Sequence, residues 1–214
     1  MDLNKDIFHF HKSQVFERYP QLKCCEKSML HALEILTESY KSGGKLLIMG
    51  NGGSSADSEH LAGELMKNFL SPRKLTTEQA KLFQNFPEDF SQKLQGALPA
   101  ISLGVSHSFL SAYMNDVDPD YIFAQGIWAL SLSQDVVLGI STSGNSKNVV
   151  LGLKVAKAKG VKSIVLTGKK ESECSQVADV AILAPENLVY KVQELHLPIY
   201  HALCIELERI FFDV

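Results

Sequence analysis

The sequence lacks a long apolar stretch and a strong net charge. A membrane-spanning helix needs about 20 mostly apolar residues, and no run of that kind occurs in the 214 residues. The N-terminus, Met1 to Lys12, is polar and contains histidines, so it does not resemble the apolar core of a secretory signal. The net charge of -3 and the pI near 6.2 provide no overall positive field for nucleic acid or anionic lipid. We therefore expect a cytoplasmic protein with no membrane or nucleic-acid partner.

Cysteines are few, and the motifs of nucleotide cofactors are absent. The four cysteines, at positions 24, 25, 174 and 204, form no C-x-x-C pair and no second cluster that would complete a sulfur zinc site. We interpret them as reduced structural thiols. Neither a G-x-G-x-x-G fingerprint nor a Walker loop occurs. A dinucleotide-binding protein is therefore the least favoured class, and no nucleotide cofactor is expected.

Short apolar runs alternate with helical patterns along the chain. With 45% hydrophobic and 21% charged residues, residues 1–214 are expected to form one domain with a buried core. Apolar spacing predicts two N-terminal helices within 1–42, separated at Pro20. The pattern predicts strands at 45–49, 100–103, 136–140, 163–167 and 180–183, and helices at 55–69, 147–159 and 190–212. Strands that alternate with helices predict an α/β fold with a parallel sheet.

Residues 71–97 interrupt this alternation. The segment is rich in Lys, Gln, Glu, Asn and Phe, contains Pro72 and Pro87, and is long for a connection in a compact domain. We interpret it as an insertion with one helix of its own. We favour the interpretation that this segment is a solvent-exposed excursion from the domain, and a lid beside a binding site is the alternative.

The turn after the strand at 136–140 carries an unusual density of hydroxyl groups. A strand that ends in such a turn and then starts a helix places hydroxyls and unpaired amides at the positive end of the helix dipole. Gly144 lets the backbone approach a ligand closely. Helix capping alone is the alternative, but the density favours a phosphate site. The turn reads Ser141-Thr142-Ser143-Gly144-Asn145-Ser146.

A second turn of similar composition follows the strand at 45–49. Its glycines Gly52 and Gly53 permit close approach to a ligand, and Asn51 or Ser54 can hydrogen-bond a hydroxylated substrate. Because carboxyl ends of parallel strands share one edge of the sheet, we expect both turns at the same edge.

Candidate acid and base groups occur on two helices. His60 and Glu64 are four residues apart, on one helix face; an ordinary exposed pair is the alternative. In the C-terminal helix, Gln193 and His201 lie about 80° apart around an ideal helix, and Pro198 is expected to kink it. We interpret His201 as a residue that takes part in the reaction. His196, two residues before Pro198, is interpreted as a buried structural histidine.

Together these motifs resemble the sugar isomerase (SIS) fold and, within it, the phosphoheptose isomerase family. The residues that carry the resemblance are those of the two turns, His60 with Glu64, and Gln193 with His196 and His201. The similarity covers nearly the whole chain apart from 71–97. It implies a three-layer, doubly wound parallel sheet flanked by helices, with N-terminal helices and a long C-terminal helix.

The resemblance also implies a reaction and a set of roles. The family converts sedoheptulose 7-phosphate to D-glycero-manno-heptose 7-phosphate within a homotetramer whose sites lie between subunits. By this analogy Glu64 is the base and His201 the acid of aldose–ketose exchange through an enediol. Asp116 matches a substrate-contacting aspartate and Ser54 a phosphate-site serine. Some members bind zinc, for which the matching residues are His60, Glu64, Gln193 and His201.

The chain departs from the family at two places. Lys67-Asn68-Phe69 replaces a Gly-Arg-aromatic turn, so that Asn68 stands where the family has a substrate-contacting arginine, and Tyr190-Lys191-Val192 precedes Gln193. These departures indicate a divergent branch, for which another sugar phosphate is the alternative substrate. The alternative function is a non-catalytic SIS module that binds a sugar phosphate or a protein partner. Retention of Glu64, Gln193 and His201 argues against that module.

Overall fold

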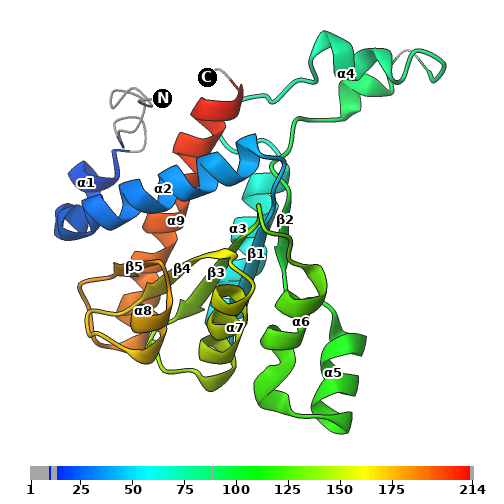
Figure 1. Cartoon of the computed structure of the whole chain (residues 1–214). Coiled ribbons are helices and arrows are strands. Elements are labelled where there is room, and N and C mark those ends of the chain that lie inside the picture. The colour runs from blue at the N-terminus through cyan, green and yellow to red at the C-terminus, as the bar shows by residue number, and fades with distance from the viewer. Residues whose placement is uncertain (1–9, 11–13, 88, 213–214) are drawn as a thin grey trace.

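The computed structural model describes residues 10, 14–87 and 89–212, and its centre is a five-stranded parallel sheet (Figure 1). The strands are β1 (Leu46–Gly50), β2 (Ala100–Ser102), β3 (Val136–Ser141), β4 (Lys162–Thr167) and β5 (Val180–Leu183). Each strand falls on an apolar run predicted as a strand, and its ends differ by no more than one residue. The parallel α/β prediction is confirmed.

The sheet reverses its winding between β1 and β3. The strand order is β2-β1-β3-β4-β5, so the chain moves outwards to β2 in one direction and to β5 in the other. Residue pairing sets Leu46 beside Val136 and Gly50 beside Ile140, which brings the carboxyl ends of β1 and β3 together. Doubly wound sheets bind ligands in the crevice at such a switch point. Both Gly/Ser-rich turns, 50–55 and 141–146, begin here.

Helices cover both faces of the sheet. Because successive strand residues point to opposite faces, Leu46 and Ile48 join one core while Leu47 and Met49 join the other. The predicted three-layer, doubly wound arrangement is therefore confirmed. The first face packs against α2 (Glu26–Lys41), α3 (Gly53–Met66) and α9 (Val189–Phe212), and the second against α6 (Ile122–Leu130), α7 (Lys147–Ala158) and α8 (Glu173–Val177).

The N-terminal region breaks at Pro20, as predicted. A short α1 (Val15–Arg18) is followed by the 3-10 helix η2 (Pro20–Cys25) and then by α2. Pro20 opens η2, because a proline in the first turn gives up no helical hydrogen bond. Residues 1–9 and 11–13 of the predicted helical region lie outside the described residues.

Between β2 and β3 the chain forms helices for which the sequence analysis predicted no element. These are α5 (His107–Asp116), the 3-10 turn η4 (Pro119–Tyr121) and α6. No residue of α5 is fully buried, but Leu110 and Tyr113 pack against the second core and, with Phe109 and Met114, follow a helical spacing, so the signal for this helix was available.

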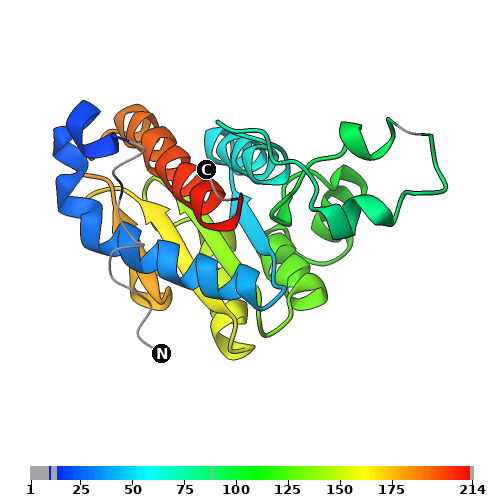
Figure 2. The same cartoon turned by 90° about the horizontal axis from the view of Figure 1, so that it is seen from above.

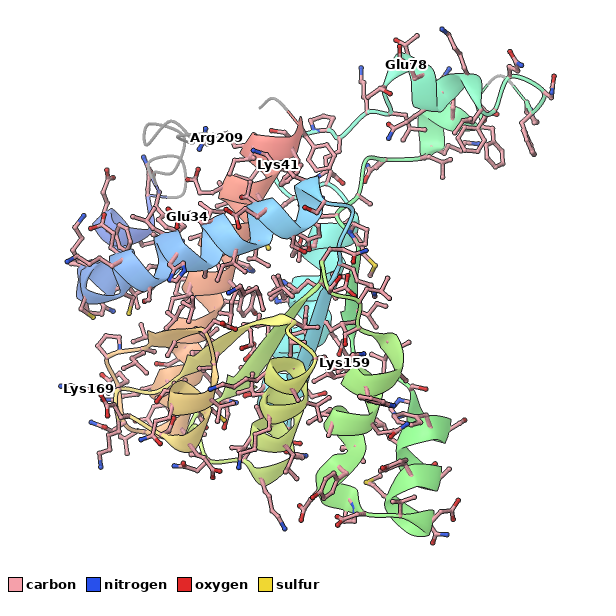
Figure 3. The ribbon with its side chains drawn as sticks, viewed as in Figure 1. Glu34, Lys41, Glu78, Lys159, Lys169 and Arg209 are labelled. Atoms are coloured by element: carbon pink, nitrogen blue, oxygen red, sulfur yellow. The ribbon has the colours of Figure 1, made fainter. Side chains whose placement is uncertain are left out.

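The segment 71–97 forms an arm that projects from the body (Figures 1 and 2). It carries α4 (Thr77–Lys81) and the 3-10 turn η3 (Ser91–Lys93), and Glu78 on α4 lies well away from the sheet (Figure 3). The arm leaves after α3 and returns to β2, so it starts at the amino edge of the sheet, opposite the two turns. A lid over the turns of the same copy is therefore geometrically disfavoured. The tip of the arm is exposed to solvent, as the favoured interpretation expected, whereas Arg73 at its root is only 1% exposed.

Two long helices on the first face position the candidate acid and base groups. Helices α3 and α9 run side by side in the same direction, with Gln193 beside Gly53, Tyr200 beside His60, and Glu208 beyond the end of α3. α9 continues as one helix through Pro198. Within the described part of the chain, no helix is long and apolar enough to cross a membrane.

Candidate active site

The first turn at the switch point is hydrogen-bonded to α7, the helix that follows the second turn. Asn51 of the first turn and Asn148 of α7 exchange two hydrogen bonds, of 2.8 and 2.9 Å, through their side-chain amides. Gly52 has a φ of 55°, which glycine tolerates, and Gly53 opens α3. Ser54 is buried directly behind them. The ligand-binding residues predicted in the first turn therefore lie next to the predicted phosphate loop.

The hydroxyl groups of the second turn gather at the start of α7. Ser141 Oγ lies 3.0 Å from Ser146 Oγ, and Ser143 Oγ accepts from the amide of Asn145 at 3.2 Å. Thr142 is half-buried between them. Ser146 is the N-cap of α7, but its side chain makes no capping bond, so this hydroxyl is not used by the helix. First-turn amides and hydroxyls at a helix N-terminus form the arrangement that favours phosphate.

Gly144 packs the loop tightly against the next connection of the sheet. Its φ is 66°, and a β-carbon there would overlap Ser172 Oγ and lie 2.8 Å from Thr167 Oγ1. Ser172 Oγ in turn accepts from the amide of Ser175 as the cap of α8. The loop conformation therefore depends on glycine at this position.

The charged residues near the second turn have partners of their own. Lys147 Nζ lies 2.6 Å from Asp120 Oδ2, and the hydrogen bond to Asp120 raises the pKa of Lys147. Asp116, the predicted substrate contact, is exposed at the end of α5 and accepts from Asn115 Nδ2 at 2.8 Å.

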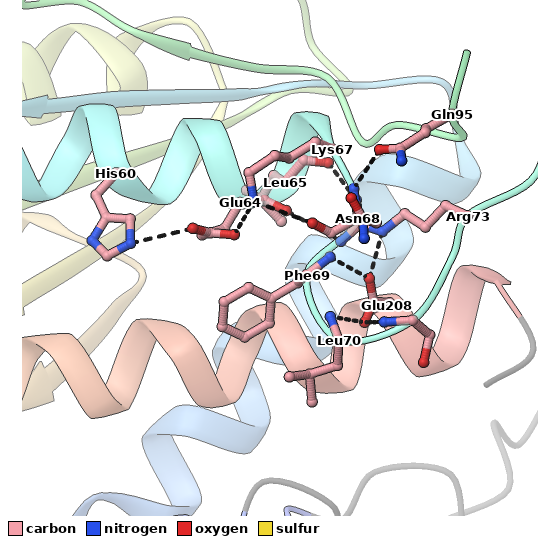
Figure 4. Close-up of polar contacts among 11 residues, drawn as sticks. His60, Glu64, Leu65, Lys67, Asn68, Phe69, Leu70, Arg73, Gln95 and Glu208 are labelled. Carbon is pink, nitrogen blue, oxygen red and sulfur yellow. Dashed lines mark hydrogen bonds and ion pairs between the residues drawn. The ribbon is translucent and has the colours of Figure 1, made fainter. Parts of the chain in front are cut away.

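The predicted acid–base residues come together between α3 and α9. His60 Nε2 lies 3.3 Å from Glu64 Oε1, and Lys67 Nζ lies 2.7 Å from Glu64 Oε2 (Figure 4). The Glu64 side chain is 14% exposed, whereas that of His60 is 44% exposed. Both carboxylate oxygens of Glu64 therefore have a nitrogen partner, one from each side. Lys67 was noted only as a departure from the family, although its position three residues after Glu64 was an available signal for this contact.

Two residues that the sequence analysis missed fix the orientation of His60. The buried Tyr200 hydroxyl lies 3.2 Å from Asp57 Oδ1 and 3.1 Å from His60 Nδ1. When Tyr200 donates its one proton to Asp57, its oxygen can accept from Nδ1–H of His60, which leaves Nε2 directed at Glu64. Asp57 is three residues before His60 and thus on the same helix face, a signal that was available. Tyr200 is on another helix and gave no such signal.

His201 completes the cluster. Its ring centroid lies 5.0 Å from that of His60 and 5.2 Å from that of Phe69. Burial, with the nearby His60, lowers the pKa of His201, although Glu64 opposes this, so the ring is neutral at pH 7. Its Nε2 is buried and has no hydrogen-bond partner among the described residues. A buried imidazole nitrogen without a partner is suited to a ligand.

A cavity adjoins His201. Its volume is about 360 Å³, and its lining includes Arg18, Phe69, Pro198 and Ile205. This volume is within the range of small-molecule sites. A ligand therefore has space to reach the His201 ring.

The phosphate loop and the acid–base cluster lie apart in one copy of the chain. Both turns sit at the carboxyl edge near Gly53, whereas Glu64 is eleven residues further along α3, about 16 Å along the helix axis. Gln193 contacts the Gly53 end and is eight residues from His201, about 12 Å along α9. One chain thus unites His60, Glu64 and His201 and leaves Gln193 with the turns.

The residues suit a metal ion only in part. Among the described residues, no group of three or more His, Cys, Asp or Glu side chains has metal-binding geometry. The donor types nevertheless fit zinc: two imidazoles and a carboxylate are a known catalytic ligand set. His60 Nε2 faces Glu64 Oε1 at 3.3 Å, so a nitrogen and a carboxylate oxygen of the donor set already lie side by side. The partnerless Nε2 of His201 belongs to the same cluster. Gln193 would have to reach such an ion from another copy.

His196 has the structural role predicted for it. It is fully buried, and its Nε2 lies 3.3 Å from the carbonyl oxygen of Thr167 behind the phosphate loop. Burial lowers its pKa to about 4, with the hydrogen bond to Thr167 opposing. His196 therefore packs as a neutral ring against β4.

Comparison with known proteins identifies the family. Residues 106–203 match the family described as SIS domain. The phosphoheptose isomerase of Citrifermentans bemidjiense is 38% identical over 85% of this chain and 83% of its own length. That of Helicobacter pylori strain P12 is 34% identical over 98% and 96%. The chain belongs to the phosphoheptose isomerase family. A solved phosphoheptose isomerase from Neisseria gonorrhoeae superimposes with a TM-score of 0.71 and 28% identity, covering 91% of this chain and 93% of that one.

Membership of the phosphoheptose isomerase family disfavours the non-catalytic alternative. The H. pylori relative aligns along nearly the entire chain, which includes both turns and both helices of the acid–base cluster. The departures from the family at Lys67 and Asn68 fall at the end of α3, where Lys67 contacts Glu64 and the Asn68 amide donates to Gln95 of the arm. The chain therefore departs from the family pattern at residues beside the acid–base cluster, but it keeps His60, Glu64 and His201 themselves.

Proposed function

We propose that the chain converts sedoheptulose 7-phosphate to D-glycero-manno-heptose 7-phosphate as a cytoplasmic sugar-phosphate isomerase. The observation that carries the proposal is the convergence of Glu64 and His201 in one cluster, in a chain that belongs to the phosphoheptose isomerase family. The four free cysteines support a reducing compartment.

The chemistry follows from the two side chains. Glu64 takes a proton from C1 of the ketose, and the electron pair of that C–H bond forms the C1–C2 double bond of the enediol as O2 gains a proton. The proton then returns to C2 while O1 loses its hydrogen and becomes the aldehyde oxygen. A neutral His201 can donate a hydrogen bond to the reacting oxygens and move a proton between them. Burial, which lowers the pKa of His201, keeps the ring in this neutral form.

The function is tested by incubating the purified full chain with sedoheptulose 7-phosphate in deuterium oxide. We expect a heptose 7-phosphate that carries solvent deuterium at C2, because Glu64 exchanges its proton with solvent during the reaction. Other ketose phosphates are assayed in parallel, because Asn68 departs from the family beside the cluster. Absence of product and of exchange with every ketose phosphate would contradict the isomerase.

We further propose that the complete site is shared between copies of a homotetramer. The separation of about 16 Å along α3 between the turns and Glu64 supports this, because it exceeds the reach of one heptose phosphate. The turn of one copy, with Asn51 to Ser54, Ser141 to Ser146 and Asp116, would hold the phosphate and the sugar hydroxyls. Glu64 and His201 of the next copy would act at the other end.

Mixing of two inactive variants tests the shared site. One variant carries Glu64→Gln and the other Ser141→Ala with Ser146→Ala. Co-expression should restore activity to about a quarter of the wild-type value, because random pairing gives that fraction of sites with both halves intact. Co-expression of two differently tagged Glu64→Gln chains is the control and should stay inactive. If the mixture also stays inactive although mixed tetramers form, the site lies within one copy.

Zinc is proposed as the metal of this cluster, held by His60, Glu64 and His201, with Gln193 supplied by another copy. When bound, zinc would polarise the substrate carbonyl as a Lewis acid. Chain purified without chelators or a histidine tag should contain about one zinc per copy. His60→Ala should lower that content, whereas His31→Ala, at an exposed position on α2, should not. A wild-type chain without bound metal would refute the zinc proposal and leave the Glu64 and His201 chemistry standing.

A further inference from the structure

A buried ion pair joins the root of the arm to α9. Arg73 Nε lies 2.8 Å from Glu208 Oε1, and the two side chains are 0% and 3% exposed. The Arg73 guanidinium also lies over the ring of Phe212, 4.8 Å from its centroid. Isolated surface pairs contribute little, but this pair is excluded from water. Its hydrogen-bond partners therefore decide what it does.

Arg73 uses its remaining nitrogens to cap α3. Nη1 donates to the carbonyl oxygen of Leu65 at 2.7 Å, and Nη2 donates to that of Glu64 at 3.2 Å. These carbonyls belong to the last turn of α3, which ends at Met66 and where carbonyl groups lack helical donors. The guanidinium therefore holds the backbone of Glu64 itself.

Glu208 holds the chain reversal that follows α3. Its two carboxylate oxygens accept from the amides of Phe69, Leu70 and Ser71 at 2.8, 2.9 and 3.2 Å (Figure 4). Burial acts to raise the pKa of Glu208, but these amides and Arg73 outweigh it, so the pKa is lowered. The ring of Phe69, whose amide Glu208 binds, packs on His201, with 5.2 Å between the two ring centroids. The sequence analysis extended this helix to residue 69, and the contacts to Arg73 and Glu208 account for its earlier end.

We infer that Arg73 and Glu208 are positioning residues for the isomerase cluster: Arg73 fixes the backbone of Glu64, and Glu208 fixes Phe69 against His201. The inference rests on the proposed function for its catalytic part. One buried ion pair thus sets the separation between the base on α3 and the acid on α9. A helix end held by several directed hydrogen bonds is more exactly placed than one held by apolar packing.

The test compares two variants with a matched control. Arg73→Lys keeps the charge but lacks the planar fork that serves Glu208 and both carbonyls together. Arg73→Met combined with Glu208→Gln removes both charges, so no unpaired buried charge remains. Lys93→Met is the control: it removes a cation of the same segment that pairs with Asp89 in solvent, with side chains 76% and 58% exposed. Thermal unfolding first establishes that each variant is folded at the assay temperature.

In the folded variants we expect kcat to fall by about 10²-fold, because misplacement of reacting groups affects the chemical step strongly. KM should stay within about twofold, because neither Arg73 nor Glu208 belongs to the turns that hold the phosphate in the proposed site. Lys93→Met should match the wild type. Unchanged kcat in a folded double variant, or equal effects on kcat and KM, would overturn the positioning role.

Hydrogen exchange provides a readout that does not depend on activity. The amides of Phe69 and Leu70 should exchange about tenfold faster or more in the double variant than in Lys93→Met. Unchanged protection would overturn the inference even in an active enzyme. If the wild type isomerises no ketose phosphate, the proposed function fails, and exchange alone then decides whether the pair orders this reversal.

Discussion

Glu64→Gln is expected to reduce turnover by about 10² to 10⁴-fold, the range that a general base contributes. Glutamine keeps the size of the side chain and can still contact His60 and Lys67, but it cannot take a proton from carbon. KM should change little, because in the proposed shared site the turns hold the phosphate, at the opposite end of the substrate from the carbons on which Glu64 acts. The measurement is steady-state kinetics together with deuterium exchange, and zinc content determined on the same sample separates loss of a base from loss of a metal ligand.

Glu59→Gln is the matched control for Glu64→Gln. Glu59 lies on the same helix but is exposed, so the same loss of one charge should leave turnover near the wild-type value. If Glu64→Gln retains turnover within about threefold while its fold and metal content are intact, another residue must be the base.

Gly144→Ala is expected to abolish most phosphate binding and to lower kcat/KM by about 10²-fold. The new methyl group would overlap Ser172 Oγ, which cannot turn away without loss of its bond to the Ser175 amide. The φ of 66° adds left-handed strain. We expect the free energy of unfolding to fall by about 2 to 4 kcal/mol from overpacking and strain together.

Gly160→Ala separates the two causes. Gly160 has a similar φ of 69°, but a β-carbon there meets no atom within 4 Å. The Gly160→Ala variant should lose only about 1 to 2 kcal/mol of stability, from the left-handed strain alone, and keep the wild-type KM. Denaturant unfolding and kinetics on both variants check this. Equal effects of the two substitutions would show that strain, not the close approach of the phosphate loop, explains Gly144.

Sequence patterns predicted the strands closely because buried parallel strands are short, continuous apolar runs bounded by glycine. The same patterns were present but missed between β2 and β3, where Leu110 and Tyr113 of α5 pack on the core and α6 buries five residues. They also extended the helix of Glu64 too far. Its end is decided by Arg73 and Glu208, which are separated in sequence by 135 residues.

The residues around His60 show the same limit. Asp57 could have been found from its spacing on α3, whereas Tyr200 orients His60 from another helix. Lys67 also could have been found, because it is three residues after Glu64. Side chains that act across two helices become neighbours only when those helices pack.

By itself the sequence determined the fold class and the two turns at the switch point, and it supplied the acid–base residues as a prediction. Local apolar periodicity, turn residues and residue type carry that information. Only the tertiary structure decided that α3 and α9 run in parallel, that this packing unites His60, Glu64 and His201, and that Glu64 lies about 16 Å along α3 from the turns at its start. The reason is physical: burial of two apolar helix faces on one sheet sets their mutual direction and offset, and no single helix encodes its neighbour's position.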